Sequence, residues 1–503
     1  MIISQGSAPP RVAAGSARIS VSSVAAALLL LSPPALADAF DEYAGNTSYT
    51  FDLHAIADGW SIALDGFPTT SEEIDGYELA GRLLVANDQT LYLQKNYGSS
   101  VYVPVATLSD GPMDPSFLAI SPDGSTIALG VGYGAPLLVF PSSILSVTSP
   151  PDLLGHGDVI ELDVNYYDGA WYGNGTLVIN GGWSGPSGYT SGVYALDLTA
   201  PQIAEIPLIT SIPGASGGIA VDSAGNLVTG IGYQTSPNRT GELRIWAAAD
   251  IQDVIDGTAS AYVYGGSEGS LLASNVLNAA ALGFDGDGAL HVGGGDAFGV
   301  GGTSENGYAA LIRASVVASV VGGSQTPVNE GSSSQYLELT PDACEDDNAT
   351  SPIAFVGHTS ALAIAWNPSG DEYSSPAGQC YSAGSASDFW EIGVTPKVTL
   401  YFPDGAPDAD SDGVPDGADN AYLTANADQR DTDGDGFGNI ADADLDNDGD
   451  VDTADYNILV ASWSTQLGNP GYNQHADFNG DGSVNTGDYN IYLARYGTSA
   501  PFY

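Results

Sequence analysis

Two acidic loops near the C-terminus, at residues 444–455 and 477–488, repeat one pattern. Each has oxygen-bearing side chains at loop positions 1, 3, 5, 9 and 12, and a glycine, Gly449 or Gly482, at position 6. Calcium needs such oxygen ligands from a short segment, and glycine permits the sharp turn between them. The pattern therefore predicts two calcium sites. Their candidate ligands are Asp444, Asp446, Asp448, Asp450, Asp452 and Asp455 in the first loop, and Asp477, Asn479, Asp481, Ser483, Asn485 and Asp488 in the second.

The two loops differ in charge. The first has carboxylates at all of these ligand positions, whereas Asn479 and Asn485 replace two of them in the second. Because calcium affinity depends on the number of charged ligands, we expect the first loop to bind more tightly. Without the ion, the clustered carboxylates repel one another and little apolar area remains to hold the segment together. Folding of this region should therefore depend on the metal.

A short helical pattern follows each loop, over residues 455–463 and 488–496, with apolar residues three and four apart. We expect Val451 and Val484, at loop position 8, to pair across the two loops. This duplicated unit, residues 443–503, resembles the type I dockerin module. The resemblance implies that a cohesin on another protein contacts loop positions 10 and 11, where the chain has Thr453, Ala454, Thr486 and Gly487. These differ from the Ser-Thr pair frequent in that family, so a purely structural use of calcium stays open.

Two further loops of the same register precede this unit, within residues 403–442. With the motif NADQRDTDGDGFGN at residues 426–439, they resemble thrombospondin type 3 repeats, which bind calcium. Ala421 stands where those repeats usually have a cysteine, so metal alone is expected to hold the segment. The candidate ligands are Asp408, Asp410, Asp412, Asp416 and Asp419, and then Asp431, Asp433, Asp435, Asn439 and Asp442.

The N-terminus has the features of a secretory signal. Arg11 and Arg18 precede an apolar stretch over residues 21–31, and the small-residue pattern Ala-Leu-Ala ends at Ala37. We expect a signal peptide at residues 1–37, which is removed before Asp38. A retained anchor is the alternative, but the apolar run is too short to span a bilayer. No later segment resembles a transmembrane helix, so we expect a secreted, extracellular or cell-surface protein.

The charge of the chain limits its partners. The 503 residues include 61 acidic and 10 basic side chains, which give a net charge of −51. Such a surface repels phosphate groups, which argues against nucleic acid and anionic lipid as partners. Divalent cations, neutral glycans and proteins are the better candidates. The two cysteines, Cys344 and Cys380, predict one disulfide in an exported protein, with two buried thiols as the alternative.

Residues 38–402 have the alternating apolar runs of a mainly β fold. A strand, a turn with Asp, Asn or Gly, and a second strand recur, and these hairpins resemble the inner strands of β-propeller blades in the WD40, NHL and lactonase-like groups. The resemblance implies a propeller of six or seven blades, with a β-sandwich array or β-helix as alternatives. The repeats lie at residues 83–93, 117–130, 170–179, 218–230, 281–292 and 362–370.

No familiar hydrolase, metalloprotease or nucleotide-binding motif occurs in this β region. Polar residues in the funnel of a propeller often form its site, and the candidates by position are His156, Glu161, Asp163, His291, Asp296 and His358, although each is more simply a turn or surface residue. Three functions therefore stay open. The first is a non-catalytic propeller that recognises a glycan or protein and is attached through the dockerin-like unit. The second is an extracellular polysaccharide hydrolase or lyase, and the third is a structural surface component.

Overall fold

The computed structural model describes nineteen parts of the chain. The predicted signal peptide, the cysteine pair, Asp296 and His358 lie outside them. In the described parts, no helix is both long enough and apolar enough to cross a membrane. The described residues are 48–52, 62–68, 73–87, 89–96, 101–109, 115–131, 136–185, 188–233, 240–277, 279–285, 288–294, 308–324, 327–329, 336–338, 353–356, 361–366, 397–401, 408–500 and 502.

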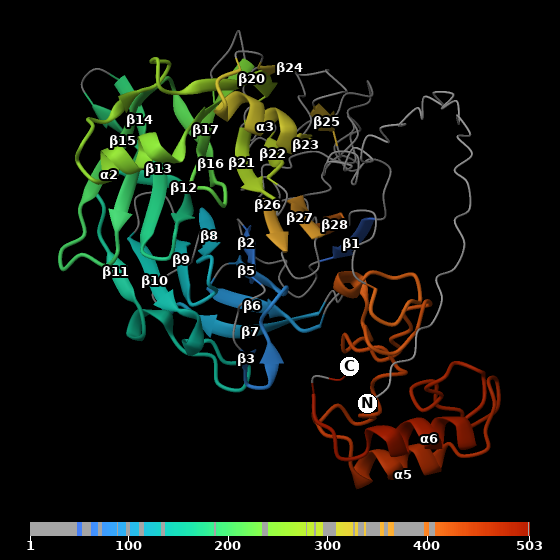
Figure 1. Cartoon of the computed structure of the whole chain (residues 1–503). Helices are drawn as coiled ribbons and strands as arrows, with labels where there is room; N and C mark the ends of the chain where they lie inside the picture. Colours follow the sequence, from blue (N-terminus) through green and yellow to red (C-terminus); the bar gives the residue numbers. More distant parts are fainter. Residues whose placement is uncertain are drawn as a thin grey trace, which may run out of the picture. The chain divides into compact units, whose positions relative to one another are not determined.

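Among the described residues, six sheets have four or five strands each, and β3 (Glu73–Ile74) and β4 (Tyr77–Glu78) form a separate hairpin (Figure 1). In hydrogen-bonded order, the first three sheets are β2 (Ile62–Gly66), β5 (Leu83–Asn87), β6 (Thr90–Gln94), β7 (Tyr102–Thr107); β8 (Phe117–Ile120), β9 (Thr126–Gly130), β10 (Leu137–Pro141), β11 (Asp158–Ile160); and β12 (Asn165–Tyr172), β13 (Thr176–Gly185), β14 (Gly188–Asp197), β15 (Glu205–Ile212), β19 (Tyr262–Val263). The other three are β16 (Ala215–Val221), β17 (Leu227–Tyr233), β18 (Thr240–Trp246), β20 (Ser270–Leu277), β24 (Val328–Asn329); β21 (Ala279–Phe284), β22 (Leu290–Gly294), β23 (Tyr308–Ile312), β25 (Tyr336–Glu338); and β26 (Ile353–Val356), β27 (Ala361–Trp366), β28 (Lys397–Tyr401), β1 (Ser48–Asp52). The short helices are η1 (Ser142–Ile144), η2 (Leu153–Gly155), α2 (Ala248–Ile255) and α3 (Ala314–Val321).

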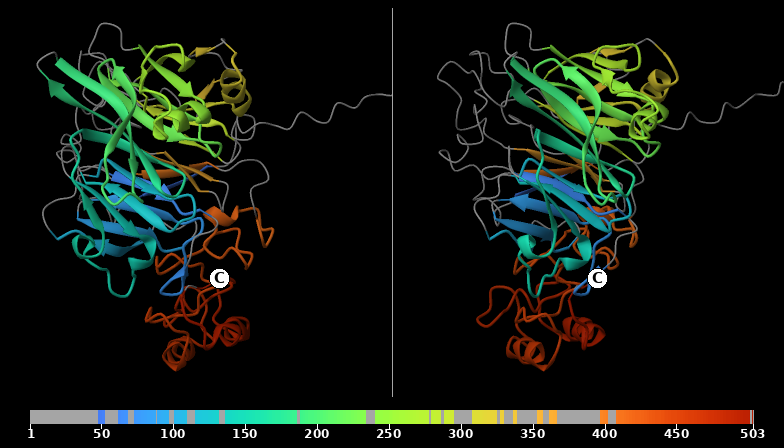
Figure 2. Two further views of the ribbon diagram at one scale, coloured as in Figure 1. Left: turned by 60° about the vertical axis from the view of Figure 1, so that its left-hand side comes forward. Right: turned by 90° about the vertical axis from the view of Figure 1, so that its left-hand side faces the viewer.

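The first strands of these sheets form a closed ring. Strand β2 contacts β8 and β26, β12 contacts β8 and β16, and β21 contacts β16 and β26. The N-terminal strand β1 completes the last sheet by pairing antiparallel with β28, from Ser48 opposite Tyr401 to Asp52 opposite Lys397. Figure 2 shows the sheets from two further directions. A ring of mainly antiparallel sheets closed by the N-terminal strand is a β-propeller. The predicted propeller is confirmed, and the β-sandwich array and β-helix are wrong.

The predicted hairpins are mostly the first two strands of a sheet. Strands β8–β9, β12–β13, β16–β17 and β21–β22 pair antiparallel at the expected places. Gly124, Gly225 and Gly288 have positive φ in their connecting turns, which explains the glycine there. The hairpin at residues 83–93 instead joins the second and third strands, β5 and β6, because β2 precedes them in the sheet. Residues 362–366 belong to a second strand, β27, and the turn expected after it lies outside the described residues.

Two aspartates on first strands bridge neighbouring sheets. Asp65 on β2 accepts a hydrogen bond from the backbone N–H of Ile120 on β8, at 2.6 Å. Asp168 on β12 accepts one from the N–H of Ile219 on β16, at 2.9 Å. Burial raises the pKa of each carboxyl to about 7, although these backbone hydrogen bonds act in the opposite direction. Each aspartate therefore satisfies a backbone donor on the adjacent sheet.

Replacing Asp168 with alanine is expected to lower the free energy of unfolding by about 1–3 kcal/mol, because the Ile219 N–H loses its partner. The pKa of Asp168 is higher in the folded state than the ordinary aspartate value, so the carboxyl contributes most stability at low pH. The cost of the substitution should therefore shrink as pH rises from about 4 to about 7. Urea unfolding at several pH values measures it, with Asp197→Ala at an exposed turn as the control. Equal losses in the free energy of unfolding for Asp168→Ala and Asp197→Ala would contradict the bridging role of Asp168.

The C-terminal part contains one 3₁₀ turn, η4 (Asp416–Ala418), and two helices, α5 (Thr453–Ala461) and α6 (Thr486–Arg495). Val451 and Val484 are fully buried in one apolar cluster. Their backbones do not pair with each other as expected. Val451 exchanges hydrogen bonds with Thr498 and Gly497 beyond α6, whereas Val484 exchanges them with residues 464 and 465 beyond α5. Each loop is therefore joined to the chain that leaves the other helix.

Candidate metal loops and helix surface

The loop at residues 444–455 brings its carboxylates together. Carboxylate oxygens of Asp444, Asp446 and Asp455 lie within 4.8 Å of one another. Asp444 accepts a hydrogen bond from the N–H of Gly449 at 2.7 Å, and Gly449 has a φ of 96°. Asp455, which is fully buried, accepts hydrogen bonds from the N–H groups of Leu445 and Asp452 at 2.7 and 2.6 Å. The backbone thus aims several carboxylates at one small volume.

The same residues that close each loop also start a helix. Asp452 and Asp455 form a capping box at the start of α5, and Asn485 and Asp488 form one at the start of α6. In a capping box, two side chains satisfy backbone donors that the first turn leaves free. Loop positions 9 and 12 therefore have a structural role in addition to any role as ligands. The helices start at Thr453 and Thr486, slightly earlier than predicted.

The loop at residues 477–488 has fewer carboxylates. The Asp477 carboxylate accepts hydrogen bonds at one oxygen from Gly482 N–H and Tyr472 O–H, at 2.9 and 2.6 Å. Its other oxygen, Oδ1, is buried without a hydrogen-bond partner. The amide groups of Asn479 and Asn485 both donate to Asp481, at 3.3 and 3.2 Å. These neutral groups partly take the place of carboxylates in this loop.

The loops at residues 408–419 and 431–442 also gather carboxylates. Oxygens of Asp408, Asp410 and Asp412 lie within 4.8 Å of one another, and so do those of Asp431, Asp433 and Asp435. In the first of these loops three carboxylate oxygens are buried without a hydrogen-bond partner: Asp408 Oδ1, Asp410 Oδ2 and Asp419 Oδ2. Leaving such oxygens unpaired is costly, and a hard divalent cation would satisfy them. The donor set therefore fits calcium.

The two pairs of loops nevertheless differ in how they close. In three of the loops a ligand-type side chain accepts a hydrogen bond from the backbone N–H at position 2. In the loop at 477–488, Asp488 at position 12 accepts instead from the N–H of Asn479 at position 3, at 3.4 Å. In the loop at 444–455 the acceptor from position 2 is Asp455, at position 12. In the earlier loops it is a residue at position 9: Asp416 accepts from Ala409 at 2.7 Å, and Asn439 accepts from Thr432 at 2.8 Å. The four loops share a sequence register but belong to two structural types.

Burial raises the pKa of several loop carboxyls. The pKa rises to about 6 for Asp419, Asp431 and Asp444, mainly because of burial. For Asp442 burial is again the largest cause, and together with the neighbouring Asp435 carboxylate it raises the pKa to about 8. Crowded acidic groups of this kind resist ionisation unless a cation is present. A bound divalent ion would offset this cost.

Hydrogen bonds of amide side chains also stabilise the segment at 408–442. Gln429 accepts from the Asn420 N–H at 2.9 Å and donates to Asp419 at 2.8 Å. Asn426 donates to Asn420 at 2.6 Å. These contacts would act in addition to any bound metal. Arg430 further joins this segment to the last loop, because it donates to the backbone oxygen of Asp477 at 2.6 Å.

Helices α5 and α6, with the residues that follow them, expose an unusual number of large apolar side chains. Trp463 is 41% exposed and Tyr496 is 54% exposed. Each ring packs edge-on against a more buried tyrosine: Trp463 against Tyr489 with centroids 6.1 Å apart, and Tyr496 against Tyr492 at 5.7 Å. Single exposed apolar residues are common, but several together mark an interaction surface. We call this set the aromatic helix face; it consists of Tyr456, Val460, Trp463, Leu493 and Tyr496.

The residues that the sequence assigned to partner contact lie at the starts of the same helices. Thr453 and Thr486 are exposed, and Ala454 and Gly487 are partly buried. A Cβ at position 487 would lie 2.8 Å from Nδ2 of Asn479, so a side chain there would require the Asn479 amide to shift.

The four funnel candidates among the described residues do not come together. His156, Glu161 and Asp163 are exposed near the outer strand β11. His291 lies on a second strand, β22, and is buried against Asp285, with 2.9 Å between Nε2 and Oδ2. Because Asp285 also accepts from the Ala289 N–H, this pair stabilises the turn between β21 and β22.

The sequence analysis missed Asp65 and Asp168, the carboxylates on the ring of first strands. The available signal was an Asp-Gly pair, Asp65-Gly66 and Asp168-Gly169, inside a run with strand character.

Comparison with known families identifies the C-terminal unit. Residues 442–495 match the family model described as the dockerin type I domain. This segment is a dockerin type I domain. It includes the two C-terminal loops, both helices and the whole aromatic helix face except Tyr496. No curated protein matches the chain as a whole.

Solved structures resemble the chain only weakly. A luciferin-regenerating enzyme is 11% identical, covering 72% of this chain and 97% of its own, with a TM-score of 0.39. Regucalcin, a calcium-binding protein from Agrobacterium tumefaciens, is 12% identical, covering 70% and 95%, with a TM-score of 0.35. The PQQ-bound aldose sugar dehydrogenase from Streptomyces coelicolor is 12% identical, covering 71% and 98%, with a TM-score of 0.38.

Proposed function

We propose that this chain is a secreted, calcium-binding modular protein whose dockerin domain attaches it to a cohesin on another protein. The aromatic helix face is the observation that carries this proposal. In the dockerin domain one set of apolar side chains is buried in the core, whereas the aromatic helix face is exposed and available to a partner. The exposed Thr453 and Thr486 extend that surface to the starts of the helices. Neighbouring acidic loops favour a partner with basic residues around an apolar centre.

Calcium binding at all four loops is part of the proposal. The gathered carboxylates, the glycines at position 6 and the unpartnered buried oxygens of Asp408, Asp410, Asp419 and Asp477 support it. The loops at 408–419 and 431–442 act as thrombospondin type 3-like calcium repeats between the propeller and the dockerin domain. In each loop the protein supplies the turn and the carboxylates, and the ion neutralises the charge of the carboxylates.

We propose that the propeller has six blades and recognises a glycan or a protein. The six sheets of four or five strands and the closed ring of first strands, all within the described residues, support this number. The acidic chain favours neutral or basic ligands over nucleic acid. A cleaved signal peptide and a Cys344–Cys380 disulfide complete the proposal, in keeping with an extracellular or cell-surface location.

A polysaccharide hydrolase or lyase is the second candidate, and the carboxyls of Asp65 and Asp168 favour it. Their raised pKa values, near 7, suit proton transfer at neutral pH. Cleavage of a polysaccharide by the full chain, lost in Asp65→Asn or Asp168→Asn, would support this function over recognition alone. A purely structural surface role is the remaining alternative, and a chain that neither binds nor cleaves any polysaccharide would favour it.

Replacing Trp463 and Tyr496 together with alanine should weaken cohesin binding by about 1,000-fold, because buried aromatic anchors often contribute about 2 kcal/mol each. Calorimetry of the full chain against a panel of cohesin domains, in calcium, measures the loss. Leu467→Ala, which removes another exposed apolar residue outside the set, is the matched control. Unchanged calcium binding would show that the double variant is folded. Full-strength cohesin binding by this double variant, or no binding of the wild type to any cohesin, would contradict the proposal.

A further inference from the structure

A turn of the propeller contacts one of the candidate calcium loops. Lys95 follows strand β6, and its ammonium lies 2.7 Å from Oδ2 of Asp435. Asp435 is at position 5 of the loop at 431–442 and lies within 4.8 Å of the carboxylates of Asp431 and Asp433. The ammonium also lies 4.8 Å from the ring centre of Phe437. A candidate calcium loop therefore has a permanent cation of the protein at its edge.

Buried polar contacts fix the position of this turn. Asn96 is fully buried, and its amide donates to the backbone oxygens of Asn420 and Gly436, at 2.9 and 3.3 Å. Arg82, also buried, donates to the backbone oxygens of Gln94 and Lys95. These hydrogen bonds fix the backbone on both sides of Lys95 and so restrict its position.

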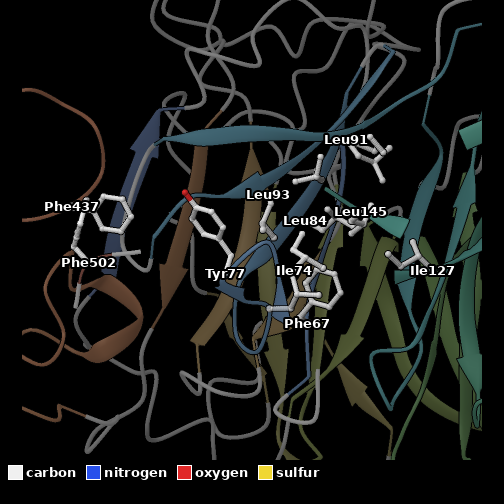
Figure 3. Packing of buried hydrophobic residues seen from close by; sticks show 14 of the residues in the cluster. Phe67, Ile74, Tyr77, Leu84, Leu91, Leu93, Ile127, Leu145, Phe437 and Phe502 are labelled. Carbon is white, nitrogen blue, oxygen red and sulfur yellow. The ribbon is translucent and has the colours of Figure 1, made fainter. Parts of the chain in front are cut away.

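Aromatic packing holds the loop on the other side of the contact. Phe437 packs edge-on against Phe502 with centroids 5.3 Å apart, and both are buried. Figure 3 shows these two rings together, on the side of the cluster where Tyr77 lies. The loop is therefore held by Phe502 on one side and by Lys95 and Asn96 of the propeller turn on the other.

Position 5 of the loop at 408–419 has a neutral donor in place of this ammonium. In both loops one oxygen of the aspartate at position 5 accepts from a backbone N–H two residues on: Asp435 from Phe437 at 2.9 Å, and Asp412 from Val414 at 2.8 Å. The second oxygen of Asp412 accepts from the neutral N–H of Asn426 at 2.7 Å. The second oxygen of Asp435 accepts from Lys95 instead. A neutral donor can share an oxygen with calcium, whereas an ammonium repels the ion.

We propose that Lys95 is an internal competitor for calcium at the loop of residues 431–442. Calcium bound there weakens the contact between Lys95 and Asp435, and the ion pair in turn lowers the calcium affinity of this loop. This linkage is reciprocal, because each cation changes the affinity of the other by the same factor. Calcium occupancy of the loop and attachment of the propeller turn are thus coupled. The proposal rests on the proposed function, in which this loop binds calcium.

The test compares Lys95→Met with the wild type by calcium titration of the full chain in a calorimeter. We expect one site to bind calcium about two- to fivefold more tightly in the variant, because an ion pair of this exposure has a modest energy. Arg244→Met is the matched control: Arg244 forms an ion pair of 2.7 Å with Glu242 and lies over Tyr264, in a part of the propeller without an acidic loop. Lys95→Arg keeps the charge and should behave as the wild type.

A second background assigns the effect to its loop. In a chain with Asp431→Asn and Asp433→Asn, one calcium site should be lost, and Lys95→Met should then change nothing. If Lys95→Met leaves calcium affinity unchanged, or lowers it, while that site exists, the competition is refuted. If the double substitution removes no site, the loop does not bind calcium, and the proposed function of this loop fails instead.

Discussion

Removal of calcium is expected to unfold the dockerin domain while the propeller stays folded. Helices α5 and α6 begin inside the loops, since Asp455 and Asp488 are both loop residues and helix caps. Each bound ion stabilises the folded state by about 4 kcal/mol when its concentration is about 1,000 times the dissociation constant. Without the ions, the crowded carboxylates repel one another and Asp477 retains an unpaired buried oxygen. The domain then has too little apolar area to remain folded.

Hydrogen exchange of the full chain, with calcium and with a chelator, measures this effect peptide by peptide. Peptides from α5 and α6 should exchange rapidly after chelation, whereas those from the sheet that contains β13 and β14 should stay protected. Addition of excess calcium should restore the protection. Magnesium serves as the control, because it demands a smaller, more regular shell of ligands. Protected helices in the chelator would refute metal-dependent folding.

Asp455→Ala is expected to abolish calcium binding at the tighter of the two dockerin sites. Asp455 accepts from Leu445 and Asp452 at 2.7 and 2.6 Å, so the variant loses a ligand, the closure of the loop and one half of the capping box. The N-cap residue, Asp452, remains. Asp488→Ala is the matched variant. The contacts of Asp488 are longer, at 3.4 Å from Asn479 and 2.8 Å from Asn485, and its loop has fewer carboxylates.

Calorimetric calcium titration of both variants separates the sites. Asp455→Ala should leave the weaker dockerin site, and Asp488→Ala should leave the stronger one. Circular dichroism at 222 nm should show a larger loss of helix for Asp455→Ala. Equal remaining affinities in the two variants would contradict the carboxylate-count prediction, because ligand charge would then not decide the difference.

Local patterns in the sequence were sufficient for the parts of the fold that local chemistry determines. Turns that contain Asp and Gly predicted the β8–β9 and β16–β17 hairpins, and the apolar spacing after each loop predicted where α5 and α6 lie. Contacts between distant segments were not accessible in this way. Asp65 and Asp168 look like ordinary strand residues until the ring places Ile120 and Ile219 opposite them.

The metal loops illustrate the same limit. Spacing predicted which residues gather, and the structure brings Asp444, Asp446 and Asp455 together. The spacing did not indicate that position 9 closes the earlier loops whereas position 12 closes the loop at 444–455. This difference depends on the path of the chain after the loop. The pairing of Val451 with residues beyond α6 was missed for the same reason.

The pairing of β1 with β28 affects the order of events during synthesis. Ser48 lies opposite Tyr401, so β1 has no partner strand until nearly the whole propeller has left the ribosome. Contacts so distant in sequence make folding slow, since a long chain must be ordered before they form. Until then the ring is open, and the unpaired edge of β1 could pair with another chain. Completion of the ring therefore has to wait for the end of the propeller segment, immediately before the acidic loops are made.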